Sequence, residues 1–460
     1  MKKQLQIFFD FLRFCIGSDS EISSSLKEAD WKELYAIAKK QCLVGVLFDG
    51  IKKLPVEHVE MEKELLLRWM AESQMLEKAN VRLNDAAIHV SEWFRKKGFR
   101  TCILKGQGNA LMYPNPYSRT PGDIDIWVEG EDKRVISFVR SISPHEKACY
   151  HHIEFPSYKG VEVEVHYRPS FLLCFWHNRK LQKYYERVKE EQFSHRVMLG
   201  EQGEIAIPTV EFNLIFQLTH IFSHLMNEGI GLRQLVDYYF VICDFYKVYQ
   251  KSSKITPSLF TLKEGSTSHP DPLSMVFTPP SVPPFPGDRN LRGEGGKRPT
   301  RCSEPLRSKD GGPSKVSPDC AGWDRLSIEG DNSAGSTTAV TSSASTALDV
   351  VQKELKELGL WKFAGGIMYI MQEVFGMPAS RLIVPPNEKY GKFVLNEVLE
   401  AGNFGKHDAR NRFGRSQLGH NLQRVYRDMR LVRYFPAEAL CEPLFRVWHF
   451  FWRVKYKIIK

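Results

Sequence analysis

Two short segments with alternating side chains constrain the fold of this 460-residue chain more than any other feature. In the first, Asp123 and Asp125 are separated by Ile124 and followed by Ile126. Successive side chains of a β-strand point to opposite faces, so both aspartates share one face while the isoleucines enter a core. Two carboxylates this close together raise one pKa or recruit a cation. An all-oxygen site of this kind suits Mg²⁺ or Mn²⁺.

The second segment, residues 161–168 with the sequence VEVEVHYR, supplies a third carboxylate. Alternation places Glu162, Glu164 and His166 on one face and the valines on the other. Glu164 lies deeper in the apolar run and is the better third metal ligand, whereas Glu162 is expected to reach solvent near the preceding turn. The sequence therefore predicts a half-buried strand with an ionisable face on the same sheet as the aspartates.

Three motifs in a fixed order carry a resemblance to a known family. Residues 105–106 read Lys-Gly, residues 119–125 read RTPGDID, and residues 163–167 read VEVHY. This set resembles the polymerase-β type nucleotidyltransferase superfamily, and more closely a bacterial nucleotidyltransferase family within it. The resemblance covers roughly residues 30–245 and resumes after about residue 348. It implies transfer of a nucleoside monophosphate from an NTP to an acceptor, with release of pyrophosphate and with Mg²⁺ or Mn²⁺ as cofactor.

The resemblance and the side-chain chemistry together suggest which residues form the site. Asp123, Asp125 and Glu164 would bind the metal ions and be the catalytic residues. The expected nucleotide-binding residues are Lys105, Gly106, Arg119, Gly122, His166, His220, His224, Arg233 and Asp237. Lys105 and Gly106 would hold the triphosphate at a strand-to-helix turn, because glycine lets backbone amides approach a phosphate and lysine adds a full charge.

Several of these nucleotide-binding residues have a structural alternative. Arg119 offers a planar fork of donors that matches a phosphate edge, or it pairs with Asp123 or Glu164. His166 orients a phosphate or an acceptor hydroxyl, or it is a structural histidine.

Two residue pairs farther along the chain each have a spacing of four positions, which places both members of a pair on one face of a helix. His220 and His224 line the nucleotide cleft, satisfy hydrogen bonds in it, or bind zinc, although the zinc-protease motif is absent. By resemblance, the helix that carries Arg233 and Asp237 closes over the nucleotide. An intrahelical ion pair between these two residues is the alternative.

The expected fold class is α+β, with a small mixed β-sheet as the nucleotidyltransferase core and helical N-terminal and C-terminal domains. The expected segments are a helical N-terminal subdomain (1–97), the α/β core (98–207), the first part of a helical domain (208–250), an insertion (251–347), and the second part of the helical domain with a basic C-terminal tail (348–460). Within the core, strands are expected at 101–104, 124–128, 150–155 and 161–167. Helices are expected to cover one side of this sheet.

The predicted insertion differs from its surroundings in composition. Residues 251–347 contain twelve of the chain's 25 prolines and ten of its 32 glycines, with almost no apolar periodicity. Such a segment cannot bury enough apolar surface to offset its ordering entropy. We therefore expect a disordered insertion within a helix-helix loop.

Charge is concentrated at the C-terminal end. The net charge is +10, and residues 401–460 hold thirteen Lys or Arg against four Asp or Glu. This tail could contact a polyanion such as nucleic acid or an anionic membrane face, or it could be a solvated helix face.

The cysteines and the apolar segments suggest a compartment. The nine cysteines are scattered and form no CxxC pair, which is typical of reduced thiols in a cytoplasmic protein. No segment has the length and purity of a membrane span. We therefore expect a cytoplasmic protein whose first helix is amphipathic rather than a signal peptide.

The acceptor stays open, because a sugar phosphate, a small metabolite, a protein hydroxyl and a tRNA end all fit the same metal geometry. The nucleotide preference is open as well. Gln107 follows Gly106 where the superfamily usually has serine or glycine. This departure leaves an alternative function, a non-catalytic nucleotide- or RNA-binding protein on the same fold. A toxin-like enzyme that nucleotidylates tRNA is a third possibility.

Overall fold

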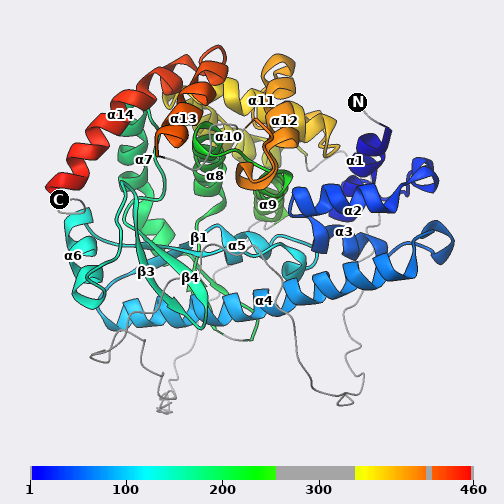
Figure 1. The fold of residues 1–460 in the computed structure, drawn as a ribbon, viewed down its shortest axis with the longest axis horizontal. Helices are drawn as coiled ribbons and strands as arrows, with labels where there is room; N and C mark the ends of the chain where they lie inside the picture. Colours follow the sequence, from blue (N-terminus) through cyan, green and yellow to red (C-terminus); the bar gives the residue numbers. More distant parts are fainter. Residues whose placement is uncertain (1–2, 202, 255–336, 411–416, 457–460) are drawn as a thin grey trace, which may run out of the picture.

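The computed structural model describes residues 3–201, 203–254, 337–410 and 417–456 (Figure 1). The α-helices are α1 (Lys3–Ile16), α2 (Trp31–Lys40), α3 (Val44–Ile51), α4 (Lys63–Lys96), α5 (Gly106–Ala110), α6 (Asp132–Ile142), α7 (Phe175–Ser194), α8 (Val210–Asn227), α9 (Leu232–Lys254), α10 (Thr337–Glu357), α11 (Trp361–Glu373), α12 (Glu388–Ala401), α13 (Gln417–Leu431) and α14 (Pro436–Lys455). Short 3₁₀ helices are η1 (Ser24–Glu28), η2 (Val56–His58), η3 (Pro116–Ser118), η5 (Ala379–Arg381) and η6 (Asn403–Gly405). The strands are β1 (Thr101–Leu104), β2 (Ile124–Val128), β3 (His152–Tyr158), β4 (Val161–His166), β5 (Arg196–Met198) and β6 (Glu204–Ala206). The fold is α+β, as predicted.

The main sheet has four strands in the order β1-β2-β4-β3. Strands β2 and β4 are parallel, whereas β1 pairs with β2 and β3 pairs with β4 in antiparallel fashion. The β2–β4 register places Asp125 opposite Glu164. The sheet is therefore mixed, as predicted, and its two central strands carry the carboxylates side by side.

The β3–β4 hairpin closes through a two-residue turn at Lys159 and Gly160, with φ of 49° and 79°. Positive φ at both central residues is typical of a type I′ turn, whose twist matches the strands. The sequence predicted this hairpin. It placed the first strand at 150–155, however, whereas β3 begins at His152. Tyr150 and His151 are excluded because residues 149–152 form a separate turn, described below.

Both faces of the sheet are covered by helices, so the expectation of cover on one side is wrong. One face packs on the long helix α4, and Figure 1 shows this helix running along the sheet. Ile124, Ile126 and Val128 are fully buried there. On the other face, the Trp127 ring lies 4.7 Å from Phe193 of α7 and 5.9 Å from Phe212 of α8, between ring centroids. Trp127 on the central strand β2 thus supplies apolar surface that packs on these helices.

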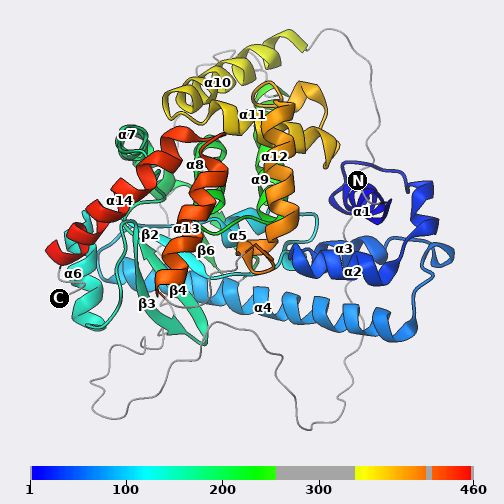
Figure 2. The ribbon, with the colours of Figure 1, turned by 45° about the horizontal axis from the view of Figure 1, so that its top comes forward.

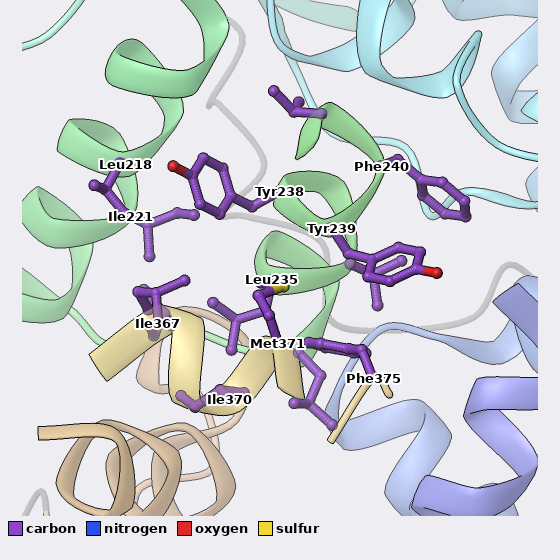
Figure 3. Packing of buried hydrophobic residues seen from close by; sticks show 14 of the residues in the cluster. Leu218, Ile221, Leu235, Tyr238, Tyr239, Phe240, Ile367, Ile370, Met371 and Phe375 are labelled. Carbon is purple, nitrogen blue, oxygen red and sulfur yellow. The ribbon is translucent and has the colours of Figure 1, made fainter. Parts of the chain in front are cut away.

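Helices from both sides of the predicted insertion share one hydrophobic core. Figure 3 shows Leu218 and Ile221 of α8, Tyr238 of α9 and Ile367 of α11 turned toward one another. Helix α10 also packs on α8 and α9, and Figure 2 shows it on the outside of this bundle. Packing of this kind explains how a chain interrupted by a long segment can still build one helical bundle.

The predicted disordered insertion falls on residues that lie almost entirely outside the described part of the chain. At its borders, α9 continues to Lys254 and α10 begins at Thr337. The predicted helix start near residue 348 was therefore late. The Ser- and Thr-rich run before residue 348 hid the helical pattern, because neither residue type marks a helix face.

The arginines of the C-terminal tail bind groups of the protein itself in several cases. Arg427 donates to the backbone carbonyl of Glu228 at 3.1 Å. Arg430 Nη2 lies 3.5 Å from Glu397 Oε2, and Arg410 forms ion pairs with Glu397 and Asp408.

The exposed side of α14 is largely apolar. Its exposed residues include Leu440, Leu444, Val447, Phe450 and Phe451.

Two further expectations concern the described residues alone. The seven cysteines among them are free thiols, as predicted. In the same residues, no helix combines the length and apolar character that crossing a membrane requires.

Candidate active site

Three carboxylates converge where β2 and β4 lie side by side. Asp123 directly precedes β2, Asp125 lies within it, and Glu164 lies opposite Asp125 on β4. One oxygen of each carboxylate can be chosen so that all three lie within 4.8 Å of one another. Strand alternation produces this arrangement, because Ile124 between the aspartates is fully buried on the opposite face. Glu162 is exposed, as predicted.

The three carboxylates have different proton affinities. Burial and the negative charges of Asp125 and Glu164 raise the pKa of Asp123 to about 6. Burial acts in the same direction on Asp125, but the Lys105 ammonium and the His166 hydrogen bond outweigh it and hold its pKa below the usual range. For Glu164, burial is likewise outweighed, chiefly by the hydrogen bond from His166 and the charge of His152, so that its pKa is lowered. Asp123 is therefore the carboxylate of the three that takes up a proton most readily.

Lys105 and His166 hold the two oxygens of Asp125. The Lys105 Nζ lies 2.9 Å from Oδ2, and the His166 Nε2 lies 3.0 Å from Oδ1. Lys105 has a positive φ of 54°, a backbone conformation that costs about 1 kcal/mol or more for a residue other than glycine. Gly106 follows with a φ of 40°, and a Cβ added there would meet no atom within 4 Å. The strained turn thus directs Lys105 into the site and leaves open space beside Gly106.

His220 and His224 of α8 lie behind Lys105. The His220 Nε2 is 3.0 Å from Lys105 Nζ and 2.9 Å from His224 Nε2. Burial and the Lys105 charge lower the pKa of His220 well below its usual value, so the ring is neutral and accepts a hydrogen bond from the ammonium. Among the described residues, neither histidine belongs to a group of three possible metal ligands. The structure thus places both histidines in hydrogen bonds around Lys105.

Arg119 forms a buried ion pair with Asp237 of α9. Its Nε and Nη2 lie 2.8 Å from the two carboxylate oxygens, and both residues are 4 % exposed. The Tyr113 hydroxyl donates to the same carboxylate at 2.6 Å. The partner of Arg119 is therefore neither Asp123 nor Glu164, and Asp237 pairs with Arg119 rather than with Arg233.

Arg233 approaches the loop that precedes the aspartates. Its Nη1 donates to the carbonyl of Thr120 at 3.1 Å, and the same nitrogen lies 4.0 Å from a Cβ built on Gly122. The side chain is buried, yet its Nε has no hydrogen-bond partner among the described residues. Arg233 therefore brings a guanidinium close to Gly122, directly before the first aspartate.

Sequence reasoning missed three residues beside the carboxylates, namely Cys149, His151 and His152. The His152 Nδ1 lies 3.4 Å from Glu164 Oε2, and the His151 ring is 5.3 Å from the His166 ring. The signal was available, because three possible metal ligands occur within four positions at the start of a strand that pairs with β4.

The affinity of the three carboxylates for a divalent cation is expected to depend on pH, because Asp123 would have to lose its proton to bind the cation. A cation must displace the proton that Asp123 holds below its pKa of about 6. We therefore expect the Mn²⁺ affinity to fall by about tenfold per pH unit below pH 6 and to level off above about pH 7. Calorimetric titrations between about pH 5 and pH 8 measure this profile, with Asp123→Asn as the control that should lose the dependence. A wild-type Mn²⁺ affinity that does not change between about pH 5 and pH 7 would contradict the role of Asp123 as a metal ligand.

Comparison with known proteins agrees with this geometry. Residues 27–248 match the model of a family described as an uncharacterised nucleotidyltransferase. Comparison with curated proteins and with solved structures gave no match. The matched residues make up slightly less than half of the chain and contain all the site residues named above. The match supports placing this part of the chain in a nucleotidyltransferase family.

Proposed function

We propose that this protein is a metal-dependent nucleotidyltransferase that moves a nucleoside monophosphate from an NTP to a hydroxyl or phosphate acceptor. The observation that carries the proposal is the convergence of Asp123, Asp125 and Glu164 within 4.8 Å on one face of the sheet. The family match over the same residues supports it. In the reaction, an acceptor oxygen bonds to the α-phosphorus, the bond to the bridging oxygen breaks, and pyrophosphate leaves. The proton of a hydroxyl acceptor passes to a base or to solvent.

The carboxylates fit a hard divalent cation. Their donor atoms are all oxygens, which suits Mg²⁺ or Mn²⁺. Burial and the neighbouring Asp125 and Glu164 raise the pKa of Asp123, and a bound cation would oppose this rise. When bound, such ions stabilise the charge on the entering and leaving oxygens of an in-line displacement. His166 holds Asp125 in place through its 3.0 Å hydrogen bond.

The phosphate contacts are assigned to Lys105 and Arg233. Lys105 pairs with Asp125 and directly precedes Gly106, where a Cβ would meet no atom within 4 Å, so its ammonium could exchange the carboxylate for a phosphate oxygen. The Arg233 guanidinium lies at the edge of the site, with Nη1 4.0 Å from a Cβ built on Gly122, and its buried Nε has no hydrogen-bond partner in the described part of the chain. Arg119 is a positioning residue in this account, because its ion pair with Asp237 joins the loop before β2 to α9. His220 and His224 support Lys105 from behind.

The acceptor and the base of the NTP stay open, since no described contact selects among them. The RNA-binding alternative relied on a basic tail. Arg410 and Arg430 of that tail pair with Glu397, which offsets part of the charge available to a polyanion. The geometry therefore favours the enzyme.

Calorimetric titration with each of the four NTPs in Mg²⁺ tests the proposal. We expect one or more NTPs to bind the wild type, and the Asp123→Asn/Asp125→Asn variant to bind at least about a hundredfold more weakly, because removing two ligands removes the charge that holds the metal–nucleotide. Glu162→Gln is the matched control. It lies on the same strand as Glu164 but is exposed and outside the carboxylate group, so its affinity should be unchanged. Equal binding by wild type and double variant would contradict the proposal.

A further inference from the structure

A tight turn that leads into β3 carries three possible metal ligands that the proposed transfer does not use. This turn comprises residues 149–152, with the sequence CYHH, and its last residue is the first residue of β3. The Cys149 N–H donates to the carbonyl of His152 at 2.9 Å, and an isolated bridge joins Ala148 to Ile153. The chain therefore folds back on itself, and Cys149 comes to lie beside His152.

The end of β4 fixes the backbone of this turn. The Tyr167 and Arg168 N–H groups both donate to the carbonyl of His151, at 3.1 and 3.2 Å. Arg168 Nη1 donates to the carbonyl of Tyr150 at 2.7 Å, and the Tyr167 hydroxyl donates to the carbonyl of Cys149. Because the backbone polar groups are satisfied in this way, the side chains project from a rigid frame.

The possible donor atoms of the three side chains lie close together. Cys149 Sγ lies 3.4 Å from His151 Nδ1, and the other ring nitrogen of His151, Nε2, lies 3.1 Å from His152 Nδ1. One donor atom of each residue can be chosen so that all three lie within 4.8 Å of one another. Metal–nitrogen bonds of about 2.0 Å and metal–sulfur bonds of about 2.3 Å give tetrahedral donor separations of roughly 3.3 to 3.6 Å. An ion would bind one nitrogen of His151, and side-chain rotation would bring the three donor atoms from within 4.8 Å to these separations.

We propose that Cys149, His151 and His152 form a binding site for a cation of the Zn²⁺ class. Sulfur and imidazole nitrogen are the donors that Zn²⁺ prefers, whereas the neighbouring carboxylates suit Mg²⁺ or Mn²⁺. The two sites thus differ in chemistry although they adjoin, since His152 Nδ1 lies 3.4 Å from Glu164 Oε2. Three protein ligands leave one coordination position for water or another ligand. An ion in the turn would also take His152 away from Glu164.

Two other groups of possible ligands are already engaged. In the group of Cys174, His177 and Glu438, the Glu438 Oε2 accepts the backbone N–H groups of Leu173 (2.6 Å) and Cys174 (2.9 Å). In the group of His152, Glu164 and His166, the His166 Nε2 is bonded to Asp125 and so belongs to the carboxylate site.

Cobalt titration tests the proposal independently of nucleotidyl transfer. The full chain, freed of metal by a chelator and kept in saturating Mg²⁺, is titrated with Co²⁺, which shows visible bands in tetrahedral sites and a near-ultraviolet band when a thiolate binds it. We expect binding with a thiolate band that Zn²⁺ abolishes by displacement. Cys149→Ser should lose the band. His151→Gln should weaken binding by at least about a hundredfold, because losing a direct ligand costs more than the 10- to 100-fold typical of supporting residues.

Controls separate this site from the carboxylates and from other thiols. Cys243→Ser, at a partly buried cysteine of α9, should keep the band, and so should Asp123→Asn/Asp125→Asn. Circular dichroism checks that each variant is folded. Persistence of the band in Cys149→Ser would overturn the proposal. The proposal would also be overturned if cobalt bound without a thiolate band and this binding were lost in His166→Gln.

Discussion

Replacing Asp125 by asparagine is expected to lower nucleotidyl transfer by about a thousandfold or more. Asp125 is the carboxylate that Lys105 and His166 hold at the centre of the group, and asparagine has neither its charge nor its second acceptor oxygen. Stabilisation of the transferring phosphoryl group by bound metal contributes several kcal/mol, which corresponds to about three powers of ten in rate. Transfer of label from an α-labelled NTP measures the effect.

The fold of Asp125→Asn should persist. The substitution removes one of three carboxylates that repel one another, and Lys105 retains His220 as a partner. Glu162→Gln is the matched control and should keep wild-type transfer. Transfer at the wild-type rate by a folded Asp125→Asn protein would rule out the proposed role.

Replacing Arg119 by methionine is expected to destabilise the protein by about 3–5 kcal/mol. The change leaves the Asp237 carboxylate buried with the Tyr113 hydroxyl as a partner and without a balancing charge. The measurement is the midpoint of denaturant-induced unfolding, followed by circular dichroism. Replacing both partners by apolar residues, as Arg119→Met/Asp237→Leu, should recover most of the loss, since no buried charge is then left unpaired.

Arg100→Met is the control for the loss of an arginine ion pair. Arg100 contacts Glu129 and Glu190, but 47 % of its side chain is exposed, so the expected cost is below about 1 kcal/mol.

The structural role of Arg119 and a role as a phosphate clamp predict different results. A phosphate clamp predicts lost NTP affinity at unchanged stability, and that outcome would contradict the structural role proposed here.

Much of the fold and of the carboxylate group could be predicted from local pattern. A two-residue period fixes which side chains share a face, so the burial of Ile124 opposite Asp125 followed from the sequence. The strand bounds at 101–104 and 124–128 were predicted correctly because each segment is short, apolar and followed by a turn. The long helix α4 lies within residues 1–97, the segment that was expected to be helical.

The remaining features depend on contacts that no local pattern contains. Arg119 and Asp237 lie 118 positions apart, and their pairing follows only from the packing of α9 on the loop before β2. The turn at residues 149–152 was missed because a strand over 150–155 would send His151 and His152 to opposite faces. The structure starts β3 at His152, and the turn before it brings both rings together.

The most direct test of the central claim is the fate of two labels in one NTP. The wild-type protein is incubated in Mg²⁺ with fractionated acceptors and with NTP labelled at the α- or the γ-phosphate. Nucleotidyl transfer predicts that the α-label enters the acceptor while the γ-label is released as pyrophosphate. In Asp125→Asn, neither labelled acceptor nor labelled pyrophosphate should form. Transfer of the γ-label to an acceptor, or its release as orthophosphate, would show different chemistry and contradict the account.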